Sequence, residues 1–221
     1  MCGRFGFTMP KAEAMEFFHL AHAEEYQPGH NLFPATPIAA ILLDPDQGRV
    51  LRLLRWGLVP AWNKEPDLNK IKFKLINARA ETAADKPSFR NAFAKRRCLI
   101  PASMFYEWQT IGKAKQPLRF TLADNKPFAM AGLWERWISP QGEPLDSCTI
   151  LTTQANALVS PIHDRMPVIL GPDAHGPWMS QDTGPSELAG LLVPYPAENM
   201  AAQPVNKQTL LPESTQASLL A

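Results

Sequence analysis

Short apolar runs bounded by glycine, proline and aspartate dominate the chain, and they predict a protein built mostly of strands. Pro37–Leu43 is a continuous apolar run, and Asp44–Gly48 has the composition of a turn that leads into a second strand at Val50–Trp56. The two runs therefore predict a β-hairpin. Four further strands are expected between polar turns, at Gln116–Leu122, Phe128–Trp137, Cys148–Thr153 and Val168–Leu170.

Apolar residues recur at helical spacing in only a few segments. Pro10–Ala23 predicts an amphipathic helix, with Pro10 in its first turn and Thr8 in a capping position. Shorter helices are expected at Pro87–Arg96 and around Pro185–Leu192. With 22 prolines in the chain, these patterns favour a loop-rich β or α+β architecture.

Composition narrows the class of protein. A length of 221 residues suits one large domain. Lysines and arginines number 22 and acidic residues 21, so nucleic-acid binding would need a local basic cluster. Cys2, Cys98 and Cys148 are too far apart for a CxxC metal site or a disulfide framework, which suits a reducing compartment. No apolar signal region or membrane-length run is present, so we expect a cytoplasmic protein without a membrane partner.

Cys2 directly follows Met1, and this position carries distinctive chemistry. Removal of Met1 by an aminopeptidase would leave a free α-amine and a thiol on one residue. The amine, which titrates at about 7.7–8.0, can form a Schiff base with an aldehyde, and the thiolate can then close a five-membered thiazolidine. The alternative is that Cys2 is a small apolar packing residue near a terminus.

Basic and aromatic residues gather after the Trp-Gly-Leu-Val-Pro-Ala-Trp motif that ends at Trp62. Lys70, Lys72 and Lys74 would form a stripe on one side of an extended chain. Lysines near aromatic residues suit single-stranded nucleic acid, whose bases stack and whose phosphates attract cations. A solvated lysine face on an edge strand is an equally good interpretation.

Asn77, Arg79 and Glu81 alternate along the chain and would share one face of any strand there. Such a face is either exposed to solvent or the wall of a site. Glu107 lies among aromatic residues in Phe-Tyr-Glu-Trp. Burial penalises a charged carboxylate and would suit it to proton transfer near neutral pH, but the side chain could instead reach water or pair with an arginine.

His163 precedes Asp164 and Arg165, and Pro167 stiffens the exit from this segment. A lone histidine is more often structural than catalytic. In an extended segment the side chain of Asp164 would point away from His163, so the sequence does not require the two to be partners.

Five motifs now stand in order along the chain: Met-Cys-Gly-Arg-Phe, Trp-Gly-Leu-Val-Pro-Ala-Trp, Ile-Asn-Ala-Arg-Ala-Glu-Thr, Phe-Tyr-Glu-Trp and His-Asp-Arg-Met-Pro. Together they resemble the SOS response-associated peptidase (SRAP) family of abasic-site processing proteins. The resemblance spans residues 1 to about 170, and Pro204-Val205-Asn206 is similar to the family's closing segment. Ala102-Ser103-Met104 departs from the family, which usually has a small residue, Asp and Gly there.

The resemblance implies a function in the DNA damage response. Members of the SRAP family bind single-stranded DNA that contains an abasic site and capture the sugar aldehyde on the mature N-terminal cysteine as a thiazolidine crosslink. This shields the lesion, and no metal or organic cofactor is used. We accordingly expect a monomeric, lyase-like enzyme that acts in the cytoplasm on the nucleoid.

The resemblance also implies residue roles. Cys2 would be the nucleophile, and Asn77 would position its backbone or thiol. Glu107 would accept or relay the amine proton, and His163 would help to open the deoxyribose ring. His163 and Glu107 would also reverse the crosslink. Arg4, Arg79 and Arg165 lie in the matching motifs and would hold the phosphates that flank the lesion, and Trp62 would stack on a neighbouring base or wedge beside it. The lysine stripe described above, and not the resemblance, adds Lys72 and Lys74 as expected DNA contacts.

Two other functions fit the same residues. Cys2, His163 and Asn77 match the inventory of a Cys-His-Asn hydrolase, which would make the chain a peptidase acting on its own N-terminus. A non-catalytic single-strand binding module would use the Lys70–Lys74 stripe alone. For the fold we predict α+β: a single domain over residues 1–207 with an antiparallel, partly barrel-like sheet and a few short flanking helices, followed by a poorly ordered tail over residues 208–221.

Overall fold

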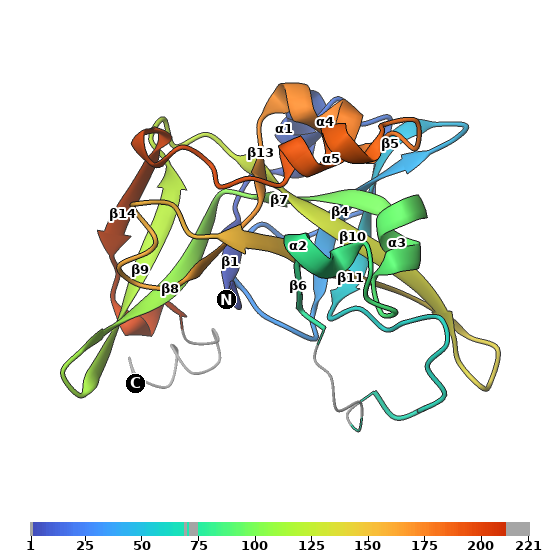
Figure 1. The fold of residues 1–221 in the computed structure, drawn as a ribbon, viewed down its shortest axis with the longest axis horizontal. Coiled ribbons are helices and arrows are strands. Elements are labelled where there is room, and N and C mark those ends of the chain that lie inside the picture. The colour runs from blue at the N-terminus through green and yellow to red at the C-terminus, as the bar shows by residue number, and fades with distance from the viewer. Residues whose placement is uncertain (1, 69, 71–74, 211–221) are drawn as a thin grey trace.

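The computed structural model describes residues 2–68, 70 and 75–210 of the chain (Figure 1). Strands predominate, and the described residues also form five short α-helices and two 3-10 helices. The strands belong to two sheets within a single domain, one of them barrel-like and the other antiparallel. The predicted α+β fold is therefore confirmed.

The barrel-like part closes because β11 pairs with strands on both of its sides. One edge of β11 pairs with β10. The other edge pairs with β5 in parallel, with Ser147 opposite Arg55 and Cys148 opposite Trp56. The ring of pairings thus runs β11–β10–β7–β4–β5 and back to β11. Its strands are β4 (Pro37–Asp44), β5 (Gly48–Trp56), β7 (Arg97–Ala102), β10 (Phe128–Ile138) and β11 (Pro144–Gln154).

Shorter strands extend this sheet. β2 (His22–Ala23) pairs with β5, and β6 (Asn77–Arg79) runs parallel to β11. β12 (Arg165–Pro167) pairs with the end of β11, and β13 (Ile169–Leu170) pairs with the start of β10. The segment that follows His163 is thus held between two long strands.

The second sheet carries the N-terminus. Its order is β14 (Met200–Pro204), β9 (Ala114–Leu122), β8 (Met104–Ile111), β1 (Phe5–Phe7) and β3 (Gly29–Leu32). Phe5 lies opposite Phe105, and the Tyr106 N–H donates to the Arg4 carbonyl at 3.0 Å. This antiparallel register brings the residues just before β1 alongside Tyr106 and Glu107.

The helices cover the sheets as short surface elements (Figure 1). α4 packs against β7 and α5, and α3 packs against β7 and β10. The helices are α1 (Lys11–Phe17), α2 (Ala80–Ala83), α3 (Arg90–Lys95), α4 (Pro172–Met179), α5 (Pro185–Leu191), η1 (Ala197–Asn199) and η2 (Lys207–Leu210).

The predicted hairpin and the strands after it are present, but three helical details differ from prediction. The first helix ends at Phe17 rather than Ala23, because His19 takes a left-handed φ of 54° and the chain then turns into β2. Strand β6 stops at Arg79, so Glu81 lies on α2 and does not share a strand face with Asn77. Helix α4 was not predicted at all.

Aromatic packing joins the two sheets at the N-terminal strand. The Phe5 ring meets the Trp56 ring edge-on at 5.2 Å between centroids, and both side chains are fully buried. The Trp56 indole N–H in turn donates to the Ile76 carbonyl at 2.9 Å. Since Asn77 follows Ile76, this contact fixes the start of β6 relative to β1.

Gly6 on β1 lies close to the backbone of β3. A Cβ there would lie 2.9 Å from the His30 carbonyl oxygen and 3.0 Å from the His30 Cα, which are backbone atoms that cannot turn aside. We predict that Gly6→Ala lowers the free energy of unfolding by about 1–3 kcal/mol, the usual cost of overpacking. Urea denaturation would measure it.

Gly190→Ala is the matched control, because the site faces open space on α5. A helical Gly→Ala change should stabilise the protein by about 0.5–1 kcal/mol. Equal stability of the Gly6→Ala variant and the unsubstituted protein would contradict the tight β1–β3 contact.

Candidate active site at the N-terminal cysteine

Cys2 lies in the interior rather than at the surface, and its side chain is fully buried. The Asn77 side-chain amide donates to the Cys2 carbonyl at 2.9 Å, and the Cys2 thiol lies 3.8 Å from the Arg4 carbonyl. Asn77 is the first residue of β6, directly after the carbonyl that Trp56 holds. The structure therefore brings Cys2 and Asn77 together through a backbone contact.

Glu107 reaches the same place from β8. Its side chain is buried, with a residue exposure of 6%. Burial raises the pKa of the Cys2 thiol, and the Glu107 carboxylate raises it further. The thiol is therefore protonated at neutral pH, and its use as a nucleophile requires a base close by. The alternative that Glu107 points to water does not apply to this structure.

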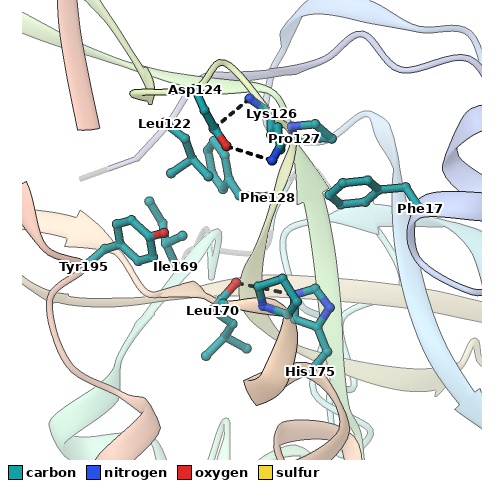
Figure 2. A pocket seen from close by; sticks show the side chains of 12 residues that line it. Phe17, Leu122, Asp124, Lys126, Pro127, Phe128, Ile169, Leu170, His175 and Tyr195 are labelled. Carbon is teal, nitrogen blue, oxygen red and sulfur yellow. Dashed lines mark hydrogen bonds and ion pairs between the residues drawn. The ribbon is translucent and has the colours of Figure 1, made fainter. Parts of the chain in front are cut away.

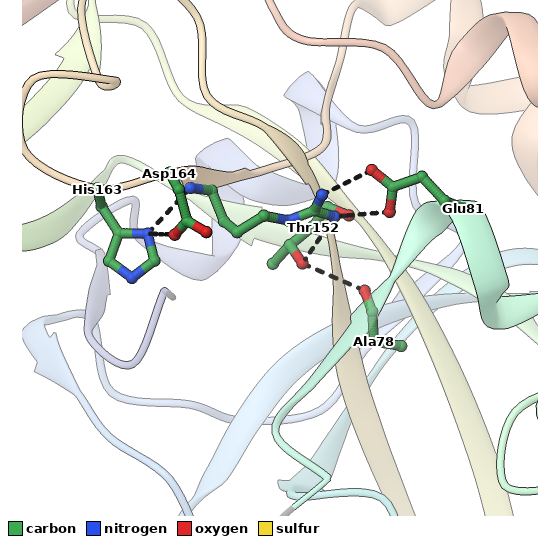
Figure 3. A network of polar contacts seen from close by, with 6 residues as sticks. Ala78, Glu81, Thr152, His163 and Asp164 are labelled. Carbon is green, nitrogen blue, oxygen red and sulfur yellow. Dashed lines mark hydrogen bonds and ion pairs between the residues drawn. The ribbon is translucent and has the colours of Figure 1, made fainter.

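His163 stands at the turn that leads into β12, with its side chain 29% exposed. Its backbone N–H donates to the Val159 carbonyl at 3.0 Å, so the segment is turned rather than extended. As a result Asp164 Oδ1 lies 2.8 Å from His163 Nδ1, and the Arg165 N–H donates to the same nitrogen at 2.9 Å (Figure 3). The sequence left open whether His163 and Asp164 are partners. Because the segment is turned rather than extended, the two side chains do lie together.

Arg165 is engaged in a bidentate ion pair with Glu81, at 2.6 and 2.8 Å (Figure 3). The guanidinium also donates to the Thr152 carbonyl, and its side chain is only 10% exposed. The hydrogen bond from Arg165 is the main cause that lowers the pKa of Glu81. Arg165 as a phosphate contact stays a prediction, and a phosphate would have to compete with Glu81 for it.

The remaining expected DNA contacts lie on the surface or outside the described residues. Arg79, at the end of β6, is exposed, and Trp62 is 61% exposed. The Trp137 indole N–H donates to the Asn63 carbonyl at 2.8 Å and so anchors the loop that carries Trp62. Lys72 and Lys74 fall outside the residues that the structure describes.

Arg4 makes a set of contacts that the sequence did not indicate. Its guanidinium donates to Asn31 Oδ1 at 2.7 Å and to the Leu210 carbonyl at 3.3 Å. It also lies over the Phe33 ring, 5.3 Å from the centroid. Asn31 lies on β3, and no feature of the sequence pointed to Leu210.

A cavity of about 180 Å³ opens on another part of the molecule (Figure 2). Apolar side chains line it, together with His175 and the ion-paired Asp124 and Lys126 at 3.3 Å. Burial lowers the pKa of His175. Neither Cys2 nor any other expected site residue lines this cavity, so it is not part of the candidate site.

Nowhere among the residues that the structure describes do three or more His, Cys, Asp or Glu side chains gather as metal ligands would. Within the same residues, each helix is too short or too polar to cross a membrane.

Comparisons with known proteins agree with the geometry. The family model for SOS response associated peptidase (SRAP) matches residues 1–210. Abasic site processing protein YoaM of Bacillus subtilis is 43% identical over 225 residues, covering 100% of this chain and 97% of that protein. Abasic site processing protein HMCES of Gallus gallus is 37% identical over 209 residues, covering 82% of this chain and 62% of that protein.

Solved structures share the fold. A protein from Bacteroides thetaiotaomicron superposes with a TM-score of 0.86 at 25% identity, over 97% of this chain and 99% of that chain. A protein from Bordetella bronchiseptica superposes with a TM-score of 0.82 at 33% identity, over 93% of this chain and 100% of that chain. Family match, relatives and fold together lead to one conclusion: the chain belongs to the SOS response associated peptidase (SRAP) family.

Proposed function

We propose that this protein processes abasic sites in single-stranded DNA by forming a covalent thiazolidine crosslink through Cys2. The observation that carries the proposal is the placement of Cys2. Its carbonyl accepts a hydrogen bond from Asn77 at 2.9 Å, and the Glu107 carboxylate raises the pKa of its buried thiol. The relatives named as abasic site processing proteins support the choice of lesion. We further propose that it acts as a cytoplasmic monomer.

The crosslink forms in two steps once Met1 has been removed. First the α-amine of Cys2 attacks the aldehyde carbon of the opened sugar, and water leaves to give an imine. The Cys2 sulfur then bonds to the imine carbon, and the thiol proton passes to the nitrogen. One water is lost overall, and no oxidant or reductant is needed.

Both steps require proton transfers, and two side chains are candidates to carry them out. Burial and the Glu107 carboxylate keep the Cys2 thiol protonated, so the thiol needs a nearby base before it can react. Glu107 is that base, for the thiol and for the amine. His163 is the acid that protonates the sugar ring oxygen and so opens the ring to the aldehyde. Asn77 holds the Cys2 backbone so that amine and thiol face the same carbon.

The DNA strand would approach along exposed basic and aromatic residues. Arg79 follows Asn77 by two positions on the same strand and would hold a flanking phosphate. Trp62 would stack on a neighbouring base. Arg4, Arg165, Lys72 and Lys74 are proposed as further phosphate contacts.

A second candidate activity is removal of Met1 by the protein itself. The observation that favours it is the buried Cys2 thiol close to a carboxylate that can act as a base. Removal of Met1 would generate the α-amine that the crosslink requires, so the two activities are compatible.

We predict that Cys2→Ala abolishes the covalent product with a single-stranded oligonucleotide that contains one abasic site, as read on a denaturing gel. Non-covalent binding of the same oligonucleotide should remain, because the phosphate contacts are unchanged. Cys148→Ala is the matched control, since it removes another fully buried thiol and should leave crosslinking intact. A thiazolidine formed by the Cys2→Ala protein would contradict the assignment.

Salt dependence tests the proposed phosphate contacts. We predict that affinity for a single strand falls as salt rises, and that Arg79→Ala reduces the slope of log affinity against log salt by about 0.7, the value for one phosphate contact. Arg136→Ala is the control, because this arginine pairs with Asp146 at 2.6 Å. Equal slopes for Arg79→Ala and Arg136→Ala would exclude Arg79 from the DNA path.

A further inference from the structure

The described part of the chain ends with a segment, residues 205–210, that lies across the second sheet. It follows β14 and contains η2 (Figure 1). The Val205 N–H donates to the Pro117 carbonyl at 3.0 Å, and the Gln116 side chain donates to the Val205 carbonyl at 2.9 Å. The start of the segment is therefore fixed to β9.

The other end of the segment is held by apolar contact with β8. Leu210 is 7% exposed and forms a small cluster with Met104 and Tyr106, against which Trp108 and Val205 pack. The three β8 residues alternate along the strand and therefore share one face, whereas Glu107 belongs to the opposite face. Leu210 thus covers the face of β8 that carries Met104 and Tyr106.

Two side-chain donors converge on the Leu210 carbonyl oxygen. Asn31 Nδ2 donates to it at 2.9 Å and Arg4 Nη1 at 3.3 Å, while Arg4 Nη1 also donates to Asn31 Oδ1 at 2.7 Å. A guanidinium and an amide that meet at one point suit a phosphate oxygen at least as well as a neutral carbonyl, because charge-assisted hydrogen bonds are the stronger ones. Arg4 lies two residues from Cys2, so a phosphate held here would flank the lesion.

We propose that Arg4 and Asn31 form one oxygen-binding site for which the segment 205–210 and a DNA phosphate compete. In the protein without DNA, the Leu210 carbonyl fills the site. A strand that binds across Cys2 replaces it and releases the end of the segment. The proposal rests on the proposed function, because the competitor is the phosphate next to the captured abasic site.

The competition has a measurable consequence. A DNA strand binds at full strength only to molecules whose segment is released. The apparent dissociation constant is therefore the intrinsic one divided by the released fraction, and a larger released fraction gives tighter binding. Leu210→Ser in the full chain weakens the apolar contact with Met104 and Tyr106 while it retains the backbone carbonyl. The variant should therefore bind a thymidine oligonucleotide without an abasic site about three- to tenfold more tightly, measured by fluorescence anisotropy.

Ile111→Ser is the matched control, because Ile111 is an exposed apolar residue on the same strand. It should leave the affinity unchanged. The gain from Leu210→Ser should also largely disappear when it is combined with Arg4→Ala, since the two changes act on one shared contact. A full gain that persists without Arg4 would overturn the proposal.

Hydrogen exchange of the unsubstituted protein gives an independent test. Saturation with the same oligonucleotide should increase exchange in the peptide that covers residues 205–210. Increased protection there, or an unchanged affinity for Leu210→Ser, would show instead that the segment is a fixed brace and would overturn the proposal.

The two proposals fail in different ways. Tighter binding by Leu210→Ser without any covalent product from an abasic oligonucleotide would support the competition and count against the thiazolidine. Crosslinking that depends on Cys2 but is indifferent to Leu210 would do the reverse. If neither the unsubstituted protein nor Leu210→Ser binds the thymidine oligonucleotide, the proposed competition is overturned, because release of the segment should have exposed the site.

Discussion

The structure depends on the way strand β1 is held at its two edges and on one face. β8 and β3 pair with its edges, and the Trp56 ring packs edge-on against Phe5. These contacts place the chain just before β1 in the interior, where Asn77 binds the Cys2 carbonyl. An N-terminal residue is ordinarily among the most mobile parts of a chain. Cys2 is instead buried and held through its carbonyl, which is the fixed placement that the proposed nucleophile requires.

The same burial sets the chemistry of the thiol. Burial and the neighbouring Glu107 carboxylate raise the pKa of the Cys2 thiol, which disfavours the reactive thiolate. In the proposed reaction, the aldehyde of the substrate reacts with the amine and Glu107 accepts the proton. Around this centre, the Arg165–Glu81 pair ties β12 to α2 and fixes the turn from which His163 projects. We infer that one site combines two features: a fixed Cys2, and an Arg4 whose contact with the Leu210 carbonyl can be replaced by a phosphate.

Much of this could be predicted from sequence, and the failures have physical causes. Apolar runs long enough to cross a barrel were found as strands because burial on both faces leaves an unmistakable pattern, as in Pro37–Asp44. Helix ends were less predictable: the left-handed His19 ends α1 although apolar spacing continues beyond it. The Asp164–His163 contact depends on a turn that ordinary residues form, and the Leu210–Arg4 contact joins positions separated by almost the whole chain. Neither leaves a local signal.

Intact-mass spectrometry of the purified protein, before and after mixing with a single-stranded oligonucleotide that carries one abasic site, tests the central claim most directly. The account predicts a protein that has lost Met1 and gains the mass of the oligonucleotide less one water, as imine formation followed by thiol addition requires. A protein that lacks Met1 yet remains unmodified by the oligonucleotide would contradict it.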